Sequence, residues 1–179
     1  MKIYSTKPTE LFSLFTDSCS VLVGEWNETN AGGSHLSFEE KTMKKEETTQ
    51  FQKELSWLDN PKFLIQFDSK DWIKDLKFQI ILSRSESIWK RRLSMSMINS
   101  MMSCYVFKYE RDNWREKCLN KDKVDFMSKN DVVIEHYEQK GDPKGYILMP
   151  ITYGKGVCGP FSIMVKSSEK FKLSVFKDK

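Results

Sequence analysis

Residues 145–176, GYILMPITYGKGVCGPFSIMVKSSEKFKLSVF, decide the fold class of this chain. In the second half of this stretch, apolar side chains fall at every second position, which is the period of a strand with one buried face. Phe161, Ile163 and Val165 share one face of such a strand, and the same alternation returns after a short Ser-Glu turn. The stretch therefore predicts antiparallel strands joined by turns.

The same pattern extends through most of the chain, and no long helical segment lies between the apolar runs. The predicted strands are residues 19–26, 62–67, 75–83, 103–109, 131–139, 145–150, 159–167 and 171–176. So many half-apolar strands favour two antiparallel sheets packed face to face. The sequence predicts an all-β, eight-stranded antiparallel β-sandwich with long loops and little helix. We expect helix only at 8–15 and 39–55, an N-terminal lead segment at 1–16, and one domain at 17–179.

The composition agrees with one well-packed domain. The 179 residues are enough for a single buried core. The hydrophobic content of 39% is modest, but 13% of the residues are aromatic, so aromatic rings should fill much of the core. From strand alternation and neighbouring motifs, we expect five aromatic residues in the core: Trp26, Trp57, Phe78, Phe107 and Phe161.

The charge pattern argues against a nucleic-acid partner. The 29 basic and 25 acidic residues are well mixed along the chain, giving a net charge of only +4. No apolar run reaches the ~18 residues that a membrane span needs, and the first residues lack the apolar region of a signal peptide. The four cysteines show no paired spacing, so we expect reduced thiols and a cytoplasmic location.

Two glycine clusters could suggest a nucleotide cofactor, but their context does not fit one. Gly154, Gly156 and Gly159 have the spacing G-x-G-x-x-G, yet a strand follows them where a phosphate-binding helix is required. Gly32 and Gly33 are not followed by the Lys-Ser/Thr pair of a phosphate loop. We therefore expect no organic cofactor and interpret these glycines as turn residues.

The residues for thiol catalysis are also poorly placed. A cysteine nucleophile needs an imidazole beside it. The two histidines are His35, in a loop, and His136, inside a predicted strand, while Cys19 and Cys104 also lie within strands. A buried thiol in a strand is normally inert. The sequence therefore predicts that this chain is not itself an enzyme.

If every strand runs antiparallel to the one before it, loops 68–75, 110–131 and 151–158 share one end of the sandwich. Asp68, Asp71 and Asp75 at that end are candidate calcium ligands. Basic residues interleaved with acids in the same group of loops would compete for the carboxylates. A calcium site and a solvated charged loop both remain open.

The same alternation places loops 28–59, 84–101 and 139–144 at the opposite end. One of these loops clusters cations around a tryptophan, which suits an anionic membrane or an acidic protein surface. The alternative is a solvated loop whose tryptophan covers the core. The residues concerned are Arg84, Trp89, Lys90, Arg91 and Arg92.

Several motifs in order resemble the calpain-type β-sandwich module, the C2-like third domain of calpain proteases. "NAGG" at 30–33 and "WLDNPKF" at 57–63 are similar to its Ala-Gly-Gly turn and its Asn-Pro motif, and 146–161 is similar to a later segment. The matching positions are Trp26, Ala31, Gly32, Gly33, Trp57, Asn60, Pro61, Phe63, Tyr146, Pro150, Thr152, Gly159 and Phe161. The resemblance spans 17–177 and implies that these residues are structural.

The resemblance also implies a function. It indicates a non-catalytic accessory domain of a calpain-like intracellular cysteine protease, which packs against the protease core or a neighbouring domain of the same protein. The alternative is a stand-alone C2-like module that docks on anionic phospholipid, with or without calcium. The chain departs from the family in an apparent insertion at 39–55, in acidic loops diluted by lysine, and in lacking the papain-like core.

Overall fold

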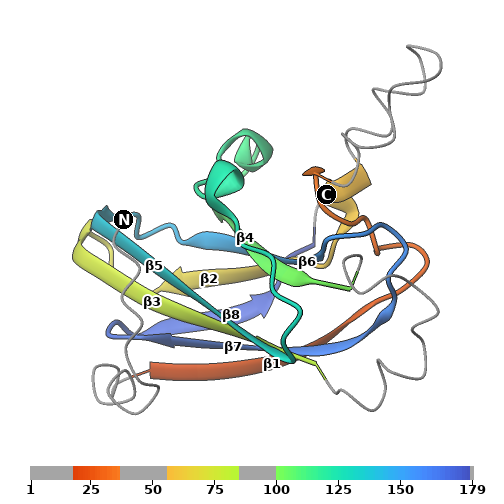
Figure 1. The fold of residues 1–179 in the computed structure, drawn as a ribbon. Helices are drawn as coiled ribbons and strands as arrows, with labels where there is room; N and C mark the ends of the chain where they lie inside the picture. The colour runs from red at the N-terminus through yellow and green to blue at the C-terminus, as the bar shows by residue number, and fades with distance from the viewer. Residues whose placement is uncertain (1–17, 37–55, 85–99, 178–179) are drawn as a thin grey trace.

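The computed structural model describes residues 18–36, 56–84 and 100–177, and it confirms the predicted all-β sandwich (Figure 1). Its strands are β1 (Ser18–Trp26), β2 (Phe63–Phe67), β3 (Ile73–Ser83), β4 (Met102–Lys108), β5 (Asp131–Gly141), β6 (Tyr146–Thr152), β7 (Gly159–Ser167) and β8 (Phe171–Val175). Three short 3-10 helices complete the described elements: η2 (Ser56–Asp59), η3 (Trp114–Glu116) and η4 (Lys121–Lys123). The helices expected at 8–15 and 39–55 lie outside the described residues. No helix in the described ranges is long and apolar enough to cross a membrane.

The eight strands form two four-stranded sheets. Sheet A has the order β1-β7-β3-β5, and sheet B has the order β4-β6-β2-β8. All neighbouring strands are antiparallel. The two sheets lie face to face with their strands roughly horizontal in Figure 1. Apolar side chains at alternate positions of both sheets meet in the space between them.

Strand direction departs from the predicted alternation at one step. β4 and β5 both start at the same end of the sandwich: Met102 lies opposite Thr152, and Asp131 lies opposite Ser83. Arg84 connects the starts of β4 and β5: its backbone N–H bonds Asn130 O, just before β5, and its side chain bonds Ser100 O, just before β4. The segment 109–130 therefore runs from one end of the sandwich to the other.

This path corrects the predicted grouping of the loops. Loop 151–158 lies with the Ala-Gly-Gly turn and the start of β4, because Gly156 N bonds Ala31 O and Tyr153 N bonds Met101 O. The turn after β5 lies at the opposite end, beside 68–75, because Gly141 is opposite Ile73. The prediction failed because it assumed that consecutive strands always reverse direction.

A third layer covers the outer face of sheet B. The segment 109–130 and η2 bury a second apolar cluster against outward-facing side chains of β4 and β6. The same segment caps the free edge of β4: Leu119 N bonds Val106 O at 2.8 Å, and Val106 N bonds Asn120 Oδ1 at 2.9 Å. Both faces of β4 and β6 are therefore buried, which explains their nearly continuous apolar sequences.

The five predicted core aromatics are all buried, with exposed fractions of 0–7%. They divide between two clusters. Trp26, Phe78 and Phe161 lie between the sheets, whereas Trp57 and Phe107 lie in the outer cluster on sheet B. The core is therefore two apolar layers, one on each side of sheet B.

Candidate functional site

Most of the family-like motif residues meet at one end of the sandwich and form a structural hub. Asn60 is fully buried, and its Nδ2 donates to Gly33 O and to Trp57 O, each at 2.7 Å. Trp26 Nε1 donates to Pro150 O at 3.1 Å, and the Trp26 ring lies 4.1 Å from that of Phe161. These contacts join the end of β1, the start of β2, the end of β6 and the start of β7.

The two adjacent glycines have a steric reason in this hub. A Cβ on Gly32 would lie 2.1 Å from Ser56 O. Gly33 has φ +74, and a Cβ there would lie 2.7 Å from Lys155 N. The remaining motif residues contribute to the same region: Ala31, Phe63 and Gly159 are buried, and Pro61 is half-buried. Tyr146 lies away from the hub, at the other end of β6.

The three candidate calcium ligands do not converge. Asp75 Oδ1 accepts a 2.8 Å hydrogen bond from Tyr137 Oη, and Asp71 N bonds Ser69 Oγ. Asp68 bonds Lys170 O through its backbone. Within the described ranges, no group of three or more His, Cys, Asp or Glu side chains could hold a metal ion. The arrangement gives the calcium interpretation no geometric support.

Arg84 has an internal role. Its guanidinium donates to Ser100 O and, at 3.2 Å, to Ser128 O, so it ties the start of β4 to the segment before β5. Burial lowers the pKa of Arg84. The other predicted members of the basic cluster, Trp89, Lys90, Arg91 and Arg92, lie outside the described residues.

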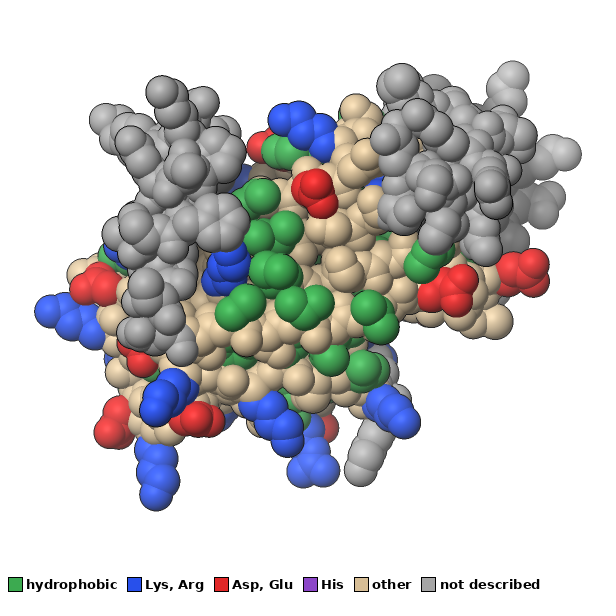
Figure 2. Space-filling view, turned by 90° about the horizontal axis from the view of Figure 1, so that it is seen from below, with side chains coloured by type: hydrophobic (Ala, Val, Ile, Leu, Met, Phe, Trp, Pro, Cys, Tyr) green, Lys and Arg blue, Asp and Glu red, His purple; other side chains and the backbone are tan. Residues whose placement is uncertain are grey.

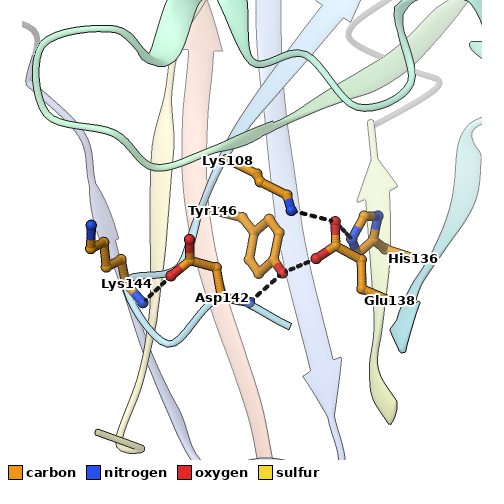
Figure 3. Close-up of polar contacts among 6 residues, drawn as sticks. All are labelled: Lys108, His136, Glu138, Asp142, Lys144 and Tyr146. Atoms are coloured by element: carbon orange, nitrogen blue, oxygen red, sulfur yellow. Dashed lines mark hydrogen bonds and ion pairs between the residues drawn. The ribbon is translucent and has the colours of Figure 1, made fainter. Parts of the chain in front are cut away.

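A charged network that the sequence reasoning missed connects the two sheets (Figure 3). Tyr146 Oη on β6 donates to Glu138 Oε2 on β5 at 2.6 Å and accepts from Asp142 N at 2.9 Å. Lys108 Nζ on β4 lies 3.4 Å from Glu138 Oε1, and His136 Nε2 lies 3.8 Å from the same oxygen. The network therefore joins β5 of sheet A to β4 and β6 of sheet B.

Two members of the network, His136 and Tyr146, have strongly shifted pKa values. Burial lowers the pKa of His136 to about 4; Glu138 opposes this shift and Lys108 adds to it. Burial and the hydrogen bond to Glu138 raise the pKa of Tyr146 well above its usual range. The imidazole is neutral and packs 4.6 Å from the Phe78 ring. A general base needs a pKa near the working pH, and that of His136 is well below neutral. These properties therefore indicate that the network is a structural contact between the sheets. The spacing His136-x-Glu138, which puts both side chains on one strand face, was the available sequence signal.

Two of the described thiols, those of Cys104 and Cys118, have raised pKa values. Burial raises the pKa of Cys104 well above its usual range and raises the pKa of Cys118 to about 11, so both thiols are protonated at neutral pH. His35 Nδ1 hydrogen bonds Tyr105 Oη. Cys19 is exposed and Cys158 is half-buried. Cys104 Sγ bonds Tyr105 O, Cys118 Sγ bonds Asn120 Oδ1, and Cys158 Sγ bonds Gly156 O.

The outer face of sheet A carries a row of apolar side chains that crosses all four strands. The pairing register sets Val21 opposite Met164, Met164 opposite Ile81, and Ile81 opposite Val133. Val21 and Val133 are 49% and 45% exposed, and Val23, beside Val21 on the same face, is 80% exposed. Figure 2 shows hydrophobic side chains gathered on the surface seen from below, the side on which β1 lies in Figure 1. We call Val21, Met164, Ile81 and Val133 the sheet A row.

On β7, β3 and β5, polar residues flank the sheet A row on both sides. In one direction the next row begins with Val23 on β1 and continues with the polar residues Ser162, Ser83 and Asp131. Lys166, Gln79 and Glu135 form the next row in the other direction. An apolar centre with a polar rim is the usual composition of a protein interface. Within the described residues, sheet A and sheet B thus differ: the outer face of sheet B is covered over β4 and β6, and that of sheet A presents this row.

The comparisons with known proteins add no family assignment. Neither a scan of protein-family models nor a search of curated protein sequences gave a match to this chain.

Proposed function

We propose that this chain is a non-catalytic β-sandwich module that packs against a neighbouring protein domain through the outer face of sheet A. The observation that carries the proposal is the sheet A row with its polar rim. An exposed apolar row of this kind gains stability when a partner removes it from water, at about 25 cal/mol per Å² of apolar area. The buried hub and the inter-sheet network give the module a rigid frame.

The motif resemblance supplies the identity of the proposed neighbour. It points to the papain-like core of a calpain-like cysteine protease in the same protein, with this chain as its accessory domain. The protonated thiols of Cys104 and Cys118 support a structural role over a catalytic one for this domain. Proteolysis would then be the activity of the neighbouring core.

Two measurements test the proposal. The gene should encode a papain-like core with its Cys, His and Asn residues, and that core should bind this chain in biolayer interferometry. Val133→Asp and Met164→Asp, in the sheet A row, should each weaken binding at least about tenfold, because each buries a charge in the interface. Val175→Asp is the matched control, since Val175 is 60% exposed on β8 of sheet B.

A gene without a protease core would contradict the assignment to a protease. Equal binding by the row variants and the wild type would contradict the assignment of the surface.

A second candidate function has one observation in its favour. Trp72, in the turn between β2 and β3, is 53% exposed, and Lys140 Nζ lies 4.6 Å from its ring centre. An exposed tryptophan beside lysine suits the headgroup region of an anionic membrane. Sedimentation with phosphatidylserine vesicles, with and without calcium, tests this alternative. Binding that Trp72→Ala weakens would favour the membrane-docking module over the protease-associated one.

A further inference from the structure

The four edges of the two sheets differ in how they are protected from further strand pairing. The edge of β4 is capped by 117–127 through the backbone and Asn120 bonds described above. The β5 edge carries the charged side chains of Glu135, Glu138 and Lys140. The β8 strand has only five residues and includes Lys172. Short length, charge and a covering segment are the usual means of blocking an edge.

Along residues 19–24, β1 has none of these protections; near its end, Asn30 Nδ2 donates to Glu25 O at 3.1 Å. It has nine residues, pairs with β7 on one side, and pairs with no described strand on the other. Its only charged side chain is Glu25, near its end, and it contains no lysine or proline. Its outward-facing Val21 and Val23 are 49% and 80% exposed. A long, apolar and nearly uncharged edge is a template for strand addition.

We propose that β1 pairs with β1 of a second copy of this chain, antiparallel and centred on Leu22. This register places Cys19 opposite Glu25 of the second copy and Ser20 opposite Gly24 of the second copy. Val21 then faces Val23 of the second copy, and the two-fold symmetry repeats each pair. The two A sheets become one continuous eight-stranded sheet.

The sequence of β1 is complementary to itself in this register. On the outer face, two Val21–Val23 pairs bring four exposed valines together, and β-branched cross-strand pairs stabilise a sheet. No two like charges are opposed, because each Glu25 faces a cysteine. Centring the pair on Val21 instead would leave Glu25 beyond the first residue of the opposing strand. The Leu22-centred register therefore uses the whole stretch 19–25, and it also brings the sheet A rows of both copies onto one surface.

Sedimentation velocity of the full chain over a wide concentration range tests the association. We expect a reversible dimer, and Val23→Lys should weaken it at least about tenfold, because two lysines then enter the valine cluster. Val133→Lys is the matched control: Val133 lies on the same face of the same sheet, on the opposite edge strand, and its substitution should leave the dimer intact. A wild type that is monomeric at every concentration, or equal effects of the two variants, would overturn the proposal.

Cysteine cross-linking tests the register. In a Cys158→Ser background, chosen because Cys158 lies beside Glu25, the variant Glu25→Cys should form a covalent dimer on mild oxidation through Cys19 of the second copy. Replacing Cys19 with Ser should abolish this product. A reversible dimer that does not cross-link would overturn the Leu22-centred register.

Hydrogen exchange at the β1 amides distinguishes a second copy from another part of the same chain as the segment that covers this edge. Protection of the β1 amides should rise with protein concentration if a second copy pairs with them. Protection that is high and independent of concentration in a monomer would mean that the chain covers its own edge, and the proposal would be wrong.

Discussion

His136 is the residue whose ionisation should couple folding to pH. Its pKa is lowered to about 4 in the fold from an ordinary value of 6.5, because burial against Phe78 and Tyr146 disfavours the imidazolium. Glu138 and Lys108 face the same ring and act in opposite directions on this pKa. The unfolded chain therefore binds an extra proton between about pH 6.5 and pH 4, so the stability contribution is complete above pH 6.5 and is lost as the pH falls.

We expect urea unfolding to show this loss, amounting to at most roughly 3 kcal/mol by pH 4. His136→Phe keeps an aromatic ring against Phe78 but cannot take up a proton. The free energy of unfolding of this variant should fall less between pH 7 and pH 4 than that of the wild type. If both proteins lose the same amount, the pH dependence belongs to other groups.

Asn60 is the residue on which the hub depends most directly. Its buried amide donates to two backbone carbonyls, those of Gly33 and Trp57, and these lie on either side of the chain's crossing from β1 to β2. Asn60→Ala leaves both carbonyls without this donor and should reduce the free energy of unfolding by roughly 2–4 kcal/mol. Asp59→Ala, at an exposed neighbouring position, is the control and should change it by less than about 0.5 kcal/mol. Thermal and urea unfolding provide the measurement, and a stable Asn60→Ala variant would show that the hub does not need this amide.

At the scale of elements, all eight strands could be predicted from the sequence, because alternation of apolar residues is a local signal. The direction of β5 could not, because it depends on the path of 109–130. That path is determined by bonds to distant backbone groups, such as Leu119 N to Val106 O. The inter-sheet network was missed for a similar reason: Lys108, Glu138 and Tyr146 come from three strands of two sheets. The sheet A row likewise needs the pairing register, which the sequence of one strand does not contain.

The segment 109–130 should be an integral part of the fold, although the sequence analysis treated it as a charged loop. Trp114 is buried, and its ring lies 5.2 Å from Phe107 on β4 and 5.8 Å from Phe176. Trp114→Ala should cost about 3–5 kcal/mol of stability and should speed hydrogen exchange at the Val106 amide, whose partner is in this segment. Glu116→Ala, at an exposed position in the same 3-10 helix, is the control. Unchanged exchange at Val106 in Trp114→Ala would show that the segment holds its place without the tryptophan.

The whole molecule is asymmetric, because the outward-pointing apolar residues of its two sheets differ in their exposure to solvent. Outward-pointing residues of sheet B, such as Ile147, are buried beneath 109–130 and η2, whereas Val133 on sheet A is 45% exposed. Burial of the outer face of sheet B contributes to the stability of the fold. Under our proposal, the outer face of sheet A contributes to binding a partner instead. Two lysine substitutions at comparable sheet positions can test the distinction.

Val133→Lys should change the free energy of unfolding by no more than about 0.5 kcal/mol, because the ammonium group remains in water. Ile147→Lys should cost more than about 4 kcal/mol, because it places an unpaired charge in an apolar layer. Urea unfolding of both variants, beside the wild type, measures the difference. A large loss in Val133→Lys would mean that part of this chain beyond the described residues already covers the sheet A row. That row could then not be the docking surface, and the proposed packing against a neighbouring domain would have to use another face.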